Sequence, residues 1–516
     1  MSPNFNVRGK AIIPCMMFMK KKMNKVTKKL ERWKARLAAG GHMQNPELYP
    51  KKDITVPTLD HSALLTFLSS MMKRRGVRFH SMDFPGAYLS ADLDTEIYMV
   101  INKQNVDILL ESKPELKEFV RDNGTIITKI QKALYGLKES GKLFRDKIVN
   151  LFDEFGLKEL ESNKCIFKKD LPSGKTFYIC VYVDDVIIAT DDEDERLAFL
   201  EYCKKSFPEI SMNSEDAFSF LGMAIKFDYK RRLIRYDNSL YIQELAETHD
   251  VTTESNMPFK SNFMNHSDQD KTMDDVRKYK SLVMALFYVA KRTRPDVLFP
   301  VSYLATRCAE PTQEDFEKAK GVLSYLLSTK GLQLTHSCDS KESKRILLAF
   351  VDASYALHQD MKGHTGALIF DECGNLLYAS STKQKLMGKS STDAEIIAVH
   401  SVMNSIEEIK DLFDELNGTK GGTSDGYPPV CLYQDNQSAK FLMENGDSKS
   451  DKSKHMKVRY FYIKSKVDES IINIKYRDTD RMWADILTKP IMIKDKFCRM
   501  RAIIMNCQEG DKYYLL

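Results

Sequence analysis

The sequence predicts a multidomain chain that combines α+β and α/β architecture. At 516 residues it is long enough for three or four domains, and 43% of its residues are hydrophobic, enough to fill several cores. Short, β-branched apolar runs that end in acidic residues occur in the first 190 residues and again after residue 345. Between them, residues 279–290 and 311–328 carry apolar side chains at helical spacing, which favours helices.

The positive charge of the chain is concentrated at its start. Residues 1–50 hold 11 Lys and Arg against 2 Asp and Glu, a net charge of +9, whereas the whole chain carries +6. A basic arm of this kind would lie on a nucleic-acid backbone and make binding salt-dependent. The same stretch also fits a solvated tail or a nuclear-entry signal, so these interpretations stay open.

Apolar stretches and cysteines indicate the compartment. The apolar segment 11–19 is too short to span a bilayer and lacks a signal-peptide cleavage pattern, and no other stretch approaches 18 apolar residues. Ten cysteines without paired short spacing fit neither a zinc knuckle nor a disulfide framework. We therefore expect a soluble, intracellular protein with no membrane partner.

Three aspartates in the first half of the chain suit a metal site. Asp184 and Asp185 lie between the apolar runs 178–183 and 186–190, a pattern that predicts two strands with the acidic pair at the turn. Upstream, an alternating strand ends at Asp83. If the two segments are neighbours in one sheet, the three carboxylates suit two divalent cations and in-line phosphoryl transfer, the chemistry of a polymerase.

A second set of acids lies in the C-terminal third, on segments predicted as strand, helix, strand and helix. Buried-type strands are predicted at 346–355, 366–370, 374–379 and 430–436, and a helix with Ser and Thr cap candidates opens at 390–395. A further helix start lies within 482–490. The four acids on these segments are Asp352, Glu395, Asp435 and Asp485.

An ordered set of motifs resembles the reverse transcriptase of copia-type LTR retrotransposons, including the yeast Ty elements. The similarity covers roughly residues 25 to 490. It is carried by ERWKARLAAGG (31–41), the segment 82–99, LYGLKES (134–140), YVDD (182–185), FLG (220–222) and RTRPD (292–296). The four C-terminal acids resemble those of the ribonuclease H domain in the same family.

The resemblance implies roles for individual residues of the polymerase. Asp83, Asp184 and Asp185 match its metal-binding triad, and Tyr88 matches the side chain that closes over the incoming sugar and favours deoxynucleotides. Two cations of the N-terminal segment, Lys34 and Arg36, match the positions that neutralise the triphosphate. Gly40 departs from the family pattern, which usually has a basic residue there.

The resemblance also implies roles in the C-terminal domain. Asp352, Glu395, Asp435 and Asp485 correspond to the ligands of two Mg²⁺ ions that activate water against the RNA strand of a hybrid. His455 falls at a position with an auxiliary role in substrate binding or product release. Departures from the pattern, none of them at an assigned carboxylate, occur at Phe144, Met284, Ala285, Ser354, Tyr355 and Ile396.

The fold implied by the resemblance is a right-hand polymerase with fingers, palm and thumb, a helical connection and a ribonuclease H-like α/β domain. We expect five parts in this order: a basic tail (1–24), the reverse transcriptase (25–250), the connection (251–343), the ribonuclease H-like domain (344–495) and a C-terminal tail (496–516).

The expected function is RNA-directed DNA synthesis with attached ribonuclease H, using two Mg²⁺ or Mn²⁺ ions per active site. Expected partners are an RNA template, a DNA primer, an RNA–DNA hybrid and deoxynucleoside triphosphates, in a cytoplasmic virus-like particle or the nucleus. Two alternatives remain: a non-catalytic relic that binds nucleic acid, and a chain in which only the ribonuclease H works. Because no zinc knuckle, protease motif or integrase module is present, we expect a mature-like fragment or a truncated copy. The oligomeric state and natural primer stay open.

Overall fold

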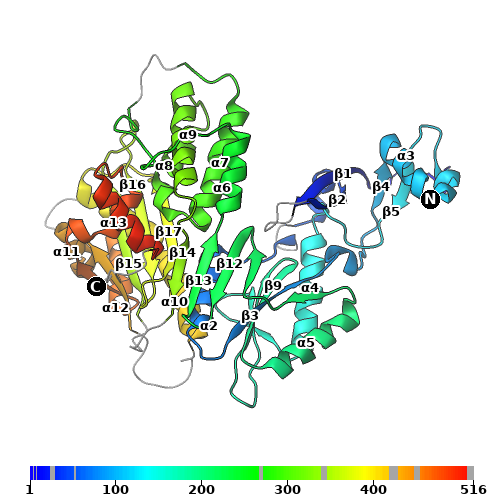
Figure 1. Cartoon of the computed structure of the whole chain (residues 1–516), viewed down its shortest axis with the longest axis horizontal. Helices are drawn as coiled ribbons and strands as arrows, with labels where there is room; N and C mark the ends of the chain where they lie inside the picture. The colour runs from blue at the N-terminus through cyan, green and yellow to red at the C-terminus, as the bar shows by residue number, and fades with distance from the viewer. Residues whose placement is uncertain are drawn as a thin grey trace. The chain divides into compact units, whose positions relative to one another are not determined.

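The computed structural model describes residues 1–3, 5–6, 9–23, 30–50, 54–265, 271–338, 346–417, 428–446 and 454–507. The chain divides into two compact units: unit 1 is Met1–Leu59 with Phe79–Ser214, and unit 2 is Asp60–Arg78 with Glu215–Leu516. Both units combine sheets and helices, which confirms the mixed multidomain architecture (Figure 1). Among the described helices, none has the length and apolar character needed to cross a membrane.

The described residues of unit 1 form two sheets. The first has the strand order β2-β1-β4-β5 and consists of β1 (Ile12–Met23), β2 (Leu30–Ala39), β4 (Tyr98–Ile101) and β5 (Ile126–Lys129). The second has the order β10-β3-β9-β8-β7-β6 and consists of β3 (Arg78–Asp83), β6 (Lys158–Glu159), β7 (Ile166–Lys168), β8 (Phe177–Tyr182), β9 (Asp185–Thr190) and β10 (Ser211–Asn213). Its helices are α3 (Lys103–Ser112), α4 (Ser140–Glu154) and α5 (Glu193–Ser206), with 3-10 turns η1 (Gly41–Met43), η2 (Pro46–Leu48), η3 (Tyr88–Ser90) and η4 (Pro114–Phe119).

The β8–β9 hairpin is the rigid centre of the six-stranded sheet. Ile179 on β8 and Val186 and Ile188 on β9 are fully or almost fully buried and pack in one core with Phe152 of α4 and Phe199 of α5. This burial explains why the sequence between residues 178 and 190 is so rich in apolar, β-branched side chains. The turn at the end of the hairpin is therefore held in a fixed position.

Unit 2 begins with a helix that the sequence did not lead us to expect. Helix α2 (His61–Met72) lies between two segments of unit 1 in the chain, yet it packs on strand β17 (Leu376–Lys383) and helix α10 (Ser391–Leu416) of unit 2. Its residues from Ala63 to Met72 are all buried. Because every face of these three turns is covered, α2 is a core element of unit 2.

A four-stranded sheet and a group of helices follow in unit 2. The sheet has the order β11-β12-β13-β14, in which the late strand β14 pairs with β13. These strands are β11 (Ala217–Phe220), β12 (Met223–Asp228), β13 (Leu233–Asp237) and β14 (Leu334–Ser337). The helices are α6 (Ser239–Thr248), α7 (Val276–Arg292), α8 (Leu298–Ala305) and α9 (Gln313–Ser328), with the 3-10 turn η5 (Pro295–Val297) (Figure 1). Helices α7 and α9 confirm the two helical patterns recognised in the sequence.

The C-terminal part of unit 2 is an α/β layer around a five-stranded mixed sheet of order β17-β16-β15-β18-β19. Its further strands are β15 (Leu348–Ser354), β16 (His364–Phe370), β18 (Val430–Gln434) and β19 (Ile472–Tyr476). Its further helices are α11 (Gln437–Asn445), α12 (Lys454–Asp468) and α13 (Lys494–Met505), with 3-10 turns η6 (Thr479–Arg481) and η7 (Trp483–Leu487). Residues 496–505 of the expected tail lie in α13, and the expected boundaries at 24–25 and 343–344 fall outside the described residues.

Candidate functional site

The β8–β9 turn holds one aspartate rather than two. Tyr182 pairs with Asp185, which is the first residue of β9, so the turn consists of Val183 and Asp184 alone. The expectation that both aspartates lie in the turn was wrong by one position. A two-residue hairpin loop requires a positive φ, and Val183 supplies it with a φ of 57°. This conformation is costly for a β-branched residue, and it leaves Asp184 as the only acid in the turn.

Asp83 reaches the same edge of the sheet from strand β3. In the strand order β3 lies next to β9, and the backbone N–H of Phe84 donates to the carbonyl oxygen of Asp184 at 3.2 Å. The end of β3 therefore lies beside the hairpin turn. We call Asp83, Asp184 and Asp185 the hairpin site. The structure brings these residues to one edge, but it does not gather their ligand atoms into a group within 4.8 Å.

Two tyrosines and an arginine border the hairpin site. The rings of Tyr88 and Tyr135 meet edge to face with centroids 4.7 Å apart, and the guanidinium of Arg36 lies 4.9 Å from the Tyr135 ring centroid. Burial and the negative charge of Asp184 raise the pKa of both tyrosines above the ordinary value. Both phenols therefore stay neutral at physiological pH.

The structure explains why the Leu-Tyr-Gly motif contains a glycine. Gly136 has a φ of +95°, and a Cβ at this position would collide with the carbonyl oxygen of Ala39 at the end of β2. The backbone N–H of Ala39 donates to the carbonyl oxygen of Tyr135 at 2.7 Å. This close approach fixes strand β2, which carries Arg36 and also Lys34, against the turn that carries Tyr135. The sequence alone assigned no role to any side chain of this motif.

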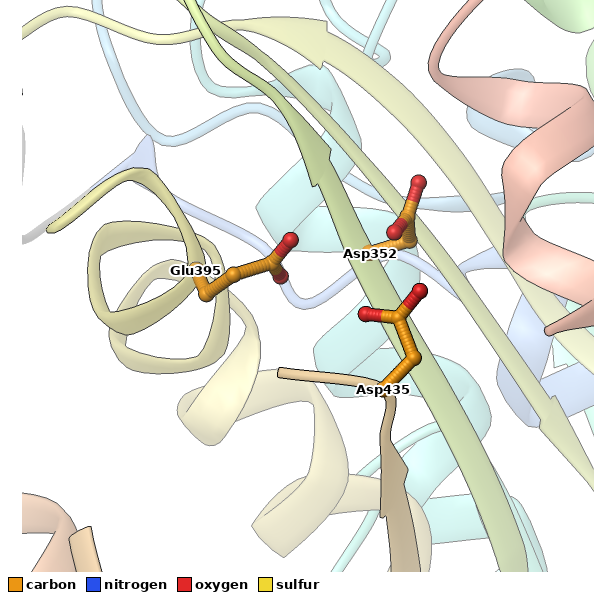
Figure 2. Close-up of side chains that lie close together, drawn as sticks. All are labelled: Asp352, Glu395 and Asp435. Carbon is orange, nitrogen blue, oxygen red and sulfur yellow. The ribbon is translucent and has the colours of Figure 1, made fainter. Parts of the chain in front are cut away.

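The second site consists of Asp352, Glu395 and Asp435, which we call the acid cluster. Their ligand oxygens all lie within 4.8 Å of one another, the only such group of three or more His, Cys, Asp or Glu in the described part of the chain. Figure 2 shows the three side chains converging from β15, α10 and the end of β18. Strands β15 and β18 are parallel, with Phe350 opposite Tyr433, so the acids two residues further on emerge side by side.

Each acid of the cluster has one oxygen that accepts a hydrogen bond from a side chain. Thr488 Oγ1 lies 2.6 Å from Asp352 Oδ2, and Thr479 Oγ1 donates to Asp435 Oδ2 at 2.8 Å. Gln434 Nε2 donates to Glu395 Oε2 at 3.2 Å. These donors orient the three carboxylates, and the backbone of Ala353 also forms a hydrogen bond with Glu395. Sequence reasoning missed all three side-chain donors, because an isolated Thr or Gln has no periodic signal.

Asp485 lies near the acid cluster but outside the group of three. It is 1% exposed in η7, and its Oδ1 lies 2.8 Å from Lys489 Nζ, while its Oδ2 lies 4.0 Å from Lys496 Nζ. Burial disfavours the charged ammonium of Lys489, yet Asp352 and Asp485 together raise its pKa. Lys489 therefore stays protonated and neutralises part of the negative charge at this edge of the sheet.

The remaining negative charge makes the acid cluster suitable for a divalent cation. Burial and the charge of Asp485 raise the pKa of Asp352 to about 7, and burial and Asp352 raise that of Glu395 well above its ordinary range. Like charges held this close oppose ionisation unless a cation joins them. Carboxylate oxygens are the ligands that Mg²⁺ and Mn²⁺ prefer, so the residues present fit a hard divalent ion.

A pH-dependent effect on stability follows from Asp352. Its folded pKa of about 7 exceeds its ordinary value of 3.8, so folding takes up a proton between these limits. The contribution to stability is complete below about pH 4 and is lost as the pH rises through about 7. We therefore expect Mg²⁺ to raise the melting temperature more above about pH 7 than below about pH 5, since the ion needs deprotonated ligands. Thermal melts with Mg²⁺ or EDTA test this. Asp435→Asn should reduce the difference, whereas equal Mg²⁺ effects at both pH values would contradict it.

His455, the remaining residue expected at a site, lies exposed in the first turn of α12. It is not part of the group of close metal-binding side chains. Its backbone carbonyl accepts a hydrogen bond from Arg459. Its auxiliary role therefore rests on the resemblance alone.

A comparison with protein families gives a match over the segment that contains the hairpin site. Residues 6–259 match the family described as reverse transcriptase (RNA-dependent DNA polymerase). This segment contains β3, β8 and β9, and with them Asp83, Asp185 and the turn residue Asp184.

Relatives extend the similarity over most of the chain. The Ty1-DR5 Gag-Pol polyprotein of Saccharomyces cerevisiae is 24% identical over 488 residues, covering 89% of this chain and 25% of the relative. The Pol polyprotein from transposon RE1 of Arabidopsis thaliana is 27% identical over 490 residues, covering 93% of this chain and 31% of the relative. The chain thus spans about a quarter to a third of the length of these relatives. Residues 6–259 thus match the reverse transcriptase family, and most of the chain is similar to retrotransposon Pol polyproteins.

Solved structures similar to this chain include a foamy viral protease-reverse transcriptase in complex with an RNA/DNA hybrid, which has a TM-score of 0.48 and 13% identity. That similarity covers 92% of this chain and 51% of the other. The same viral protein in complex with double-stranded DNA has a TM-score of 0.46 and 12% identity, covering 86% and 63%.

Proposed function

We propose that the chain is an RNA-directed DNA polymerase with an attached ribonuclease H. Its substrates are an RNA template, a DNA primer, deoxynucleoside triphosphates and, at the acid cluster, an RNA–DNA hybrid. The observation that carries the proposal is the position of the hairpin site, where Asp83 and Asp184 meet at one sheet edge within the segment that matches the reverse transcriptase family. Its expected place in a virus-like particle or the nucleus stays a prediction.

In the polymerase reaction, the hairpin site would hold two Mg²⁺ or Mn²⁺ ions. Such ions, when bound, lower the pKa of an attacking hydroxyl and neutralise the charge that develops on the departing oxygen. The chain's own residues orient the nucleotide. Tyr88 presents a ring edge backed by Tyr135, and this ring would exclude a 2′-hydroxyl. Arg36, whose guanidinium lies over the Tyr135 ring, would neutralise the triphosphate. The same role for Lys34 rests on the resemblance, because its side chain lies outside the described part of the structure.

In the ribonuclease H reaction, the four acids Asp352, Glu395, Asp435 and Asp485 would hold divalent cations, which when bound would activate water against the RNA strand. The hydrogen bonds from Thr488, Thr479 and Gln434 keep each carboxylate of the acid cluster in one orientation. Less reorganisation is then needed when the RNA strand binds, which favours the reaction.

The test is primer extension on an RNA template with deoxynucleotides and Mg²⁺, and again with Mn²⁺. A parallel assay measures cleavage of the RNA strand in a preformed hybrid. We expect both activities. A folded protein that binds the hybrid but shows neither would support a non-catalytic relic and overturn the proposal.

A second candidate, a chain in which only the ribonuclease H works, has one observation in its favour. Only the acid cluster gathers its ligand oxygens within 4.8 Å among the described residues, whereas the hairpin site does not. Hybrid cleavage without any primer extension would favour this candidate.

Substitution of Tyr88 tests the selection of the sugar. Because the ring would contact the 2′-position, Tyr88→Ala should raise the use of ribonucleotides relative to deoxynucleotides by about 10- to 100-fold, the usual effect of opening a small steric pocket. Tyr88→Phe keeps the ring packed on Tyr135 and should retain the wild-type ratio. Single-nucleotide extension with each nucleotide type measures this, and an unchanged ratio in Tyr88→Ala would rule out the assigned role.

A further inference from the structure

Thr488 occupies a position that links two of the four acids. It follows η7 directly and is completely buried. Its Oγ1 lies 2.6 Å from Asp352 Oδ2 and 3.1 Å from the carbonyl oxygen of Asp485. One short side chain thus contacts the acid at the end of β15 and the turn that carries the fourth acid.

The Thr488 hydroxyl has a single hydrogen, so it can donate fully to only one of these two acceptors. The carbonyl of Asp485 already accepts the backbone N–H of Thr488 at 3.1 Å. The Asp352 oxygen is closer, and in the ionised form that binds a cation this carboxylate is a stronger acceptor than a neutral carbonyl. The hydrogen therefore points to Asp352 Oδ2.

The surrounding structure is built to hold Thr488 in this place. Gly366 lies opposite Asp352 in the β15–β16 ladder, and a Cβ on Gly366 would lie 2.7 Å from Thr488 Cγ2 and 2.8 Å from the carbonyl oxygen of Ala484. The missing side chain makes room for η7 against the sheet. Ser354 Oγ also donates to the carbonyl oxygen of Thr488 at 3.0 Å, which fastens this segment to β15.

We propose that Thr488 is a positioning residue of the acid cluster. Its hydroxyl holds Oδ2 of Asp352, so that the other oxygen of this carboxylate is presented to the divalent cation shared with Glu395 and Asp435. The proposal rests on the proposed function of the acid cluster as a cation site. Hydrogen bonds from outer residues to metal ligands commonly contribute 10- to 100-fold to metal affinity.

The test compares variants that differ only by the hydroxyl, in the full chain. Thr488→Val keeps the shape of the side chain without the hydroxyl, and Thr488→Ser keeps the hydroxyl. Calorimetric titration with Mg²⁺ and with Mn²⁺ should show affinity at the acid cluster about 10- to 100-fold weaker in Thr488→Val and within about threefold of wild type in Thr488→Ser. Hybrid cleavage should follow the same order.

The controls separate positioning from folding. The part of the isotherm that belongs to the acid cluster is defined as the part that Asp435→Asn removes. Melting temperatures in EDTA report any loss of structure. If Thr488→Val does not fold, Thr488→Ala and Thr488→Ser form a second pair that differs by the hydroxyl.

Two outcomes would overturn the proposal in distinguishable ways. Equal metal affinity in wild type and in the variants without the hydroxyl would refute the role of Thr488 but keep the cation site. Identical isotherms for wild type and Asp435→Asn would refute the cation site itself, and the positioning role with it.

Discussion

Replacing Asp185 by Asn should abolish primer extension and leave cleavage of an RNA–DNA hybrid unchanged. The substitution keeps the shape of the side chain but removes a charge from the hairpin site, where a divalent cation would lose several kcal/mol of stabilising interaction. At about 1.4 kcal/mol per tenfold change in rate, extension should fall by about 1,000-fold or more. Hybrid cleavage should persist because the acid cluster lies in the other compact unit and has its own ligands.

The corresponding substitution at the acid cluster provides the matched control. Asp435→Asn removes one ligand of the acid cluster and should abolish hybrid cleavage while extension continues on a template that requires no RNA removal. Both variants should keep the wild-type melting temperature in EDTA within a few degrees, since neither position is in an apolar core. If Asp185→Asn lost both activities at wild-type stability, the two sites would not be independent.

The sequence predicted the strands of the hairpin site but not the details of its turn. A buried hairpin was evident from the β-branched run, and β8 and β9 lie within a residue of the expected positions. The position of the turn was not evident from the sequence, because Val183 adopts a φ that is rare for a β-branched residue. The sequence pattern favoured a turn at Asp184 and Asp185. The pairing of Tyr182 with Asp185 instead places the turn at Val183 and Asp184.

The acid cluster was predictable as a set of residues but not as a geometry. The patterns placed Asp352 on a strand and Glu395 in a helix that Ser390 caps, as observed, whereas Asp435 follows β18 directly and is not part of the strand. Strands β15 and β18 become neighbours by pairing residues that are 83 positions apart, such as Leu348 and Cys431, and periodicity carries no such information. The sequence pattern likewise could not show that Asp485 lies outside the acid cluster and pairs with Lys489.

Helix α2 shows the limit of reading a chain in contiguous domains. It lies within the segment that matches the reverse transcriptase family, yet its contacts are with elements some 300 residues later in the chain. Ser69 Oγ donates to Asp371 Oδ2 at 2.6 Å, and Arg74 donates to the carbonyl oxygen of Leu416 at 2.6 Å. No composition shift marks the points where the chain leaves and re-enters unit 1.

The end of α2 carries a buried ion cluster that ties it to the β16–β17 turn. Lys73 Nζ lies 3.0 Å from Asp371 Oδ2 and 2.9 Å from Glu372 Oε1, and the Asp371 side chain has no exposed surface. Burial would raise the pKa of Asp371, but the charge of Lys73 and the hydroxyl of Ser69 outweigh it and lower that pKa. Asn375 also donates to Asp371 through its backbone N–H at 2.9 Å.

Lys73→Met should therefore destabilise unit 2 strongly. The methionine fills the same space but leaves Asp371 and Glu372 without a cation, and breaking a buried ion pair on one side costs about 3–5 kcal/mol. Urea denaturation followed by a probe in unit 2 measures the free energy of unfolding. The exposed Lys385 provides the control, since Lys385→Met should change the stability by less than about 0.5 kcal/mol.

The pH dependence of this loss distinguishes an unpaired charge from a packing defect. In Lys73→Met the pKa of Asp371 would rise above its unfolded value, and the pKa of Glu372, which burial already raises, would rise further. The folded variant would then bind protons more tightly than the unfolded chain, so its stability would fall as the pH rises. The difference from wild type should shrink toward low pH, because the protonated acids no longer need a cation. A loss that stayed constant with pH would instead reflect altered packing. A loss no larger than that of Lys385→Met would mean that Lys73 does not hold α2 to the β16–β17 turn, and that apolar burial alone keeps this helix in unit 2.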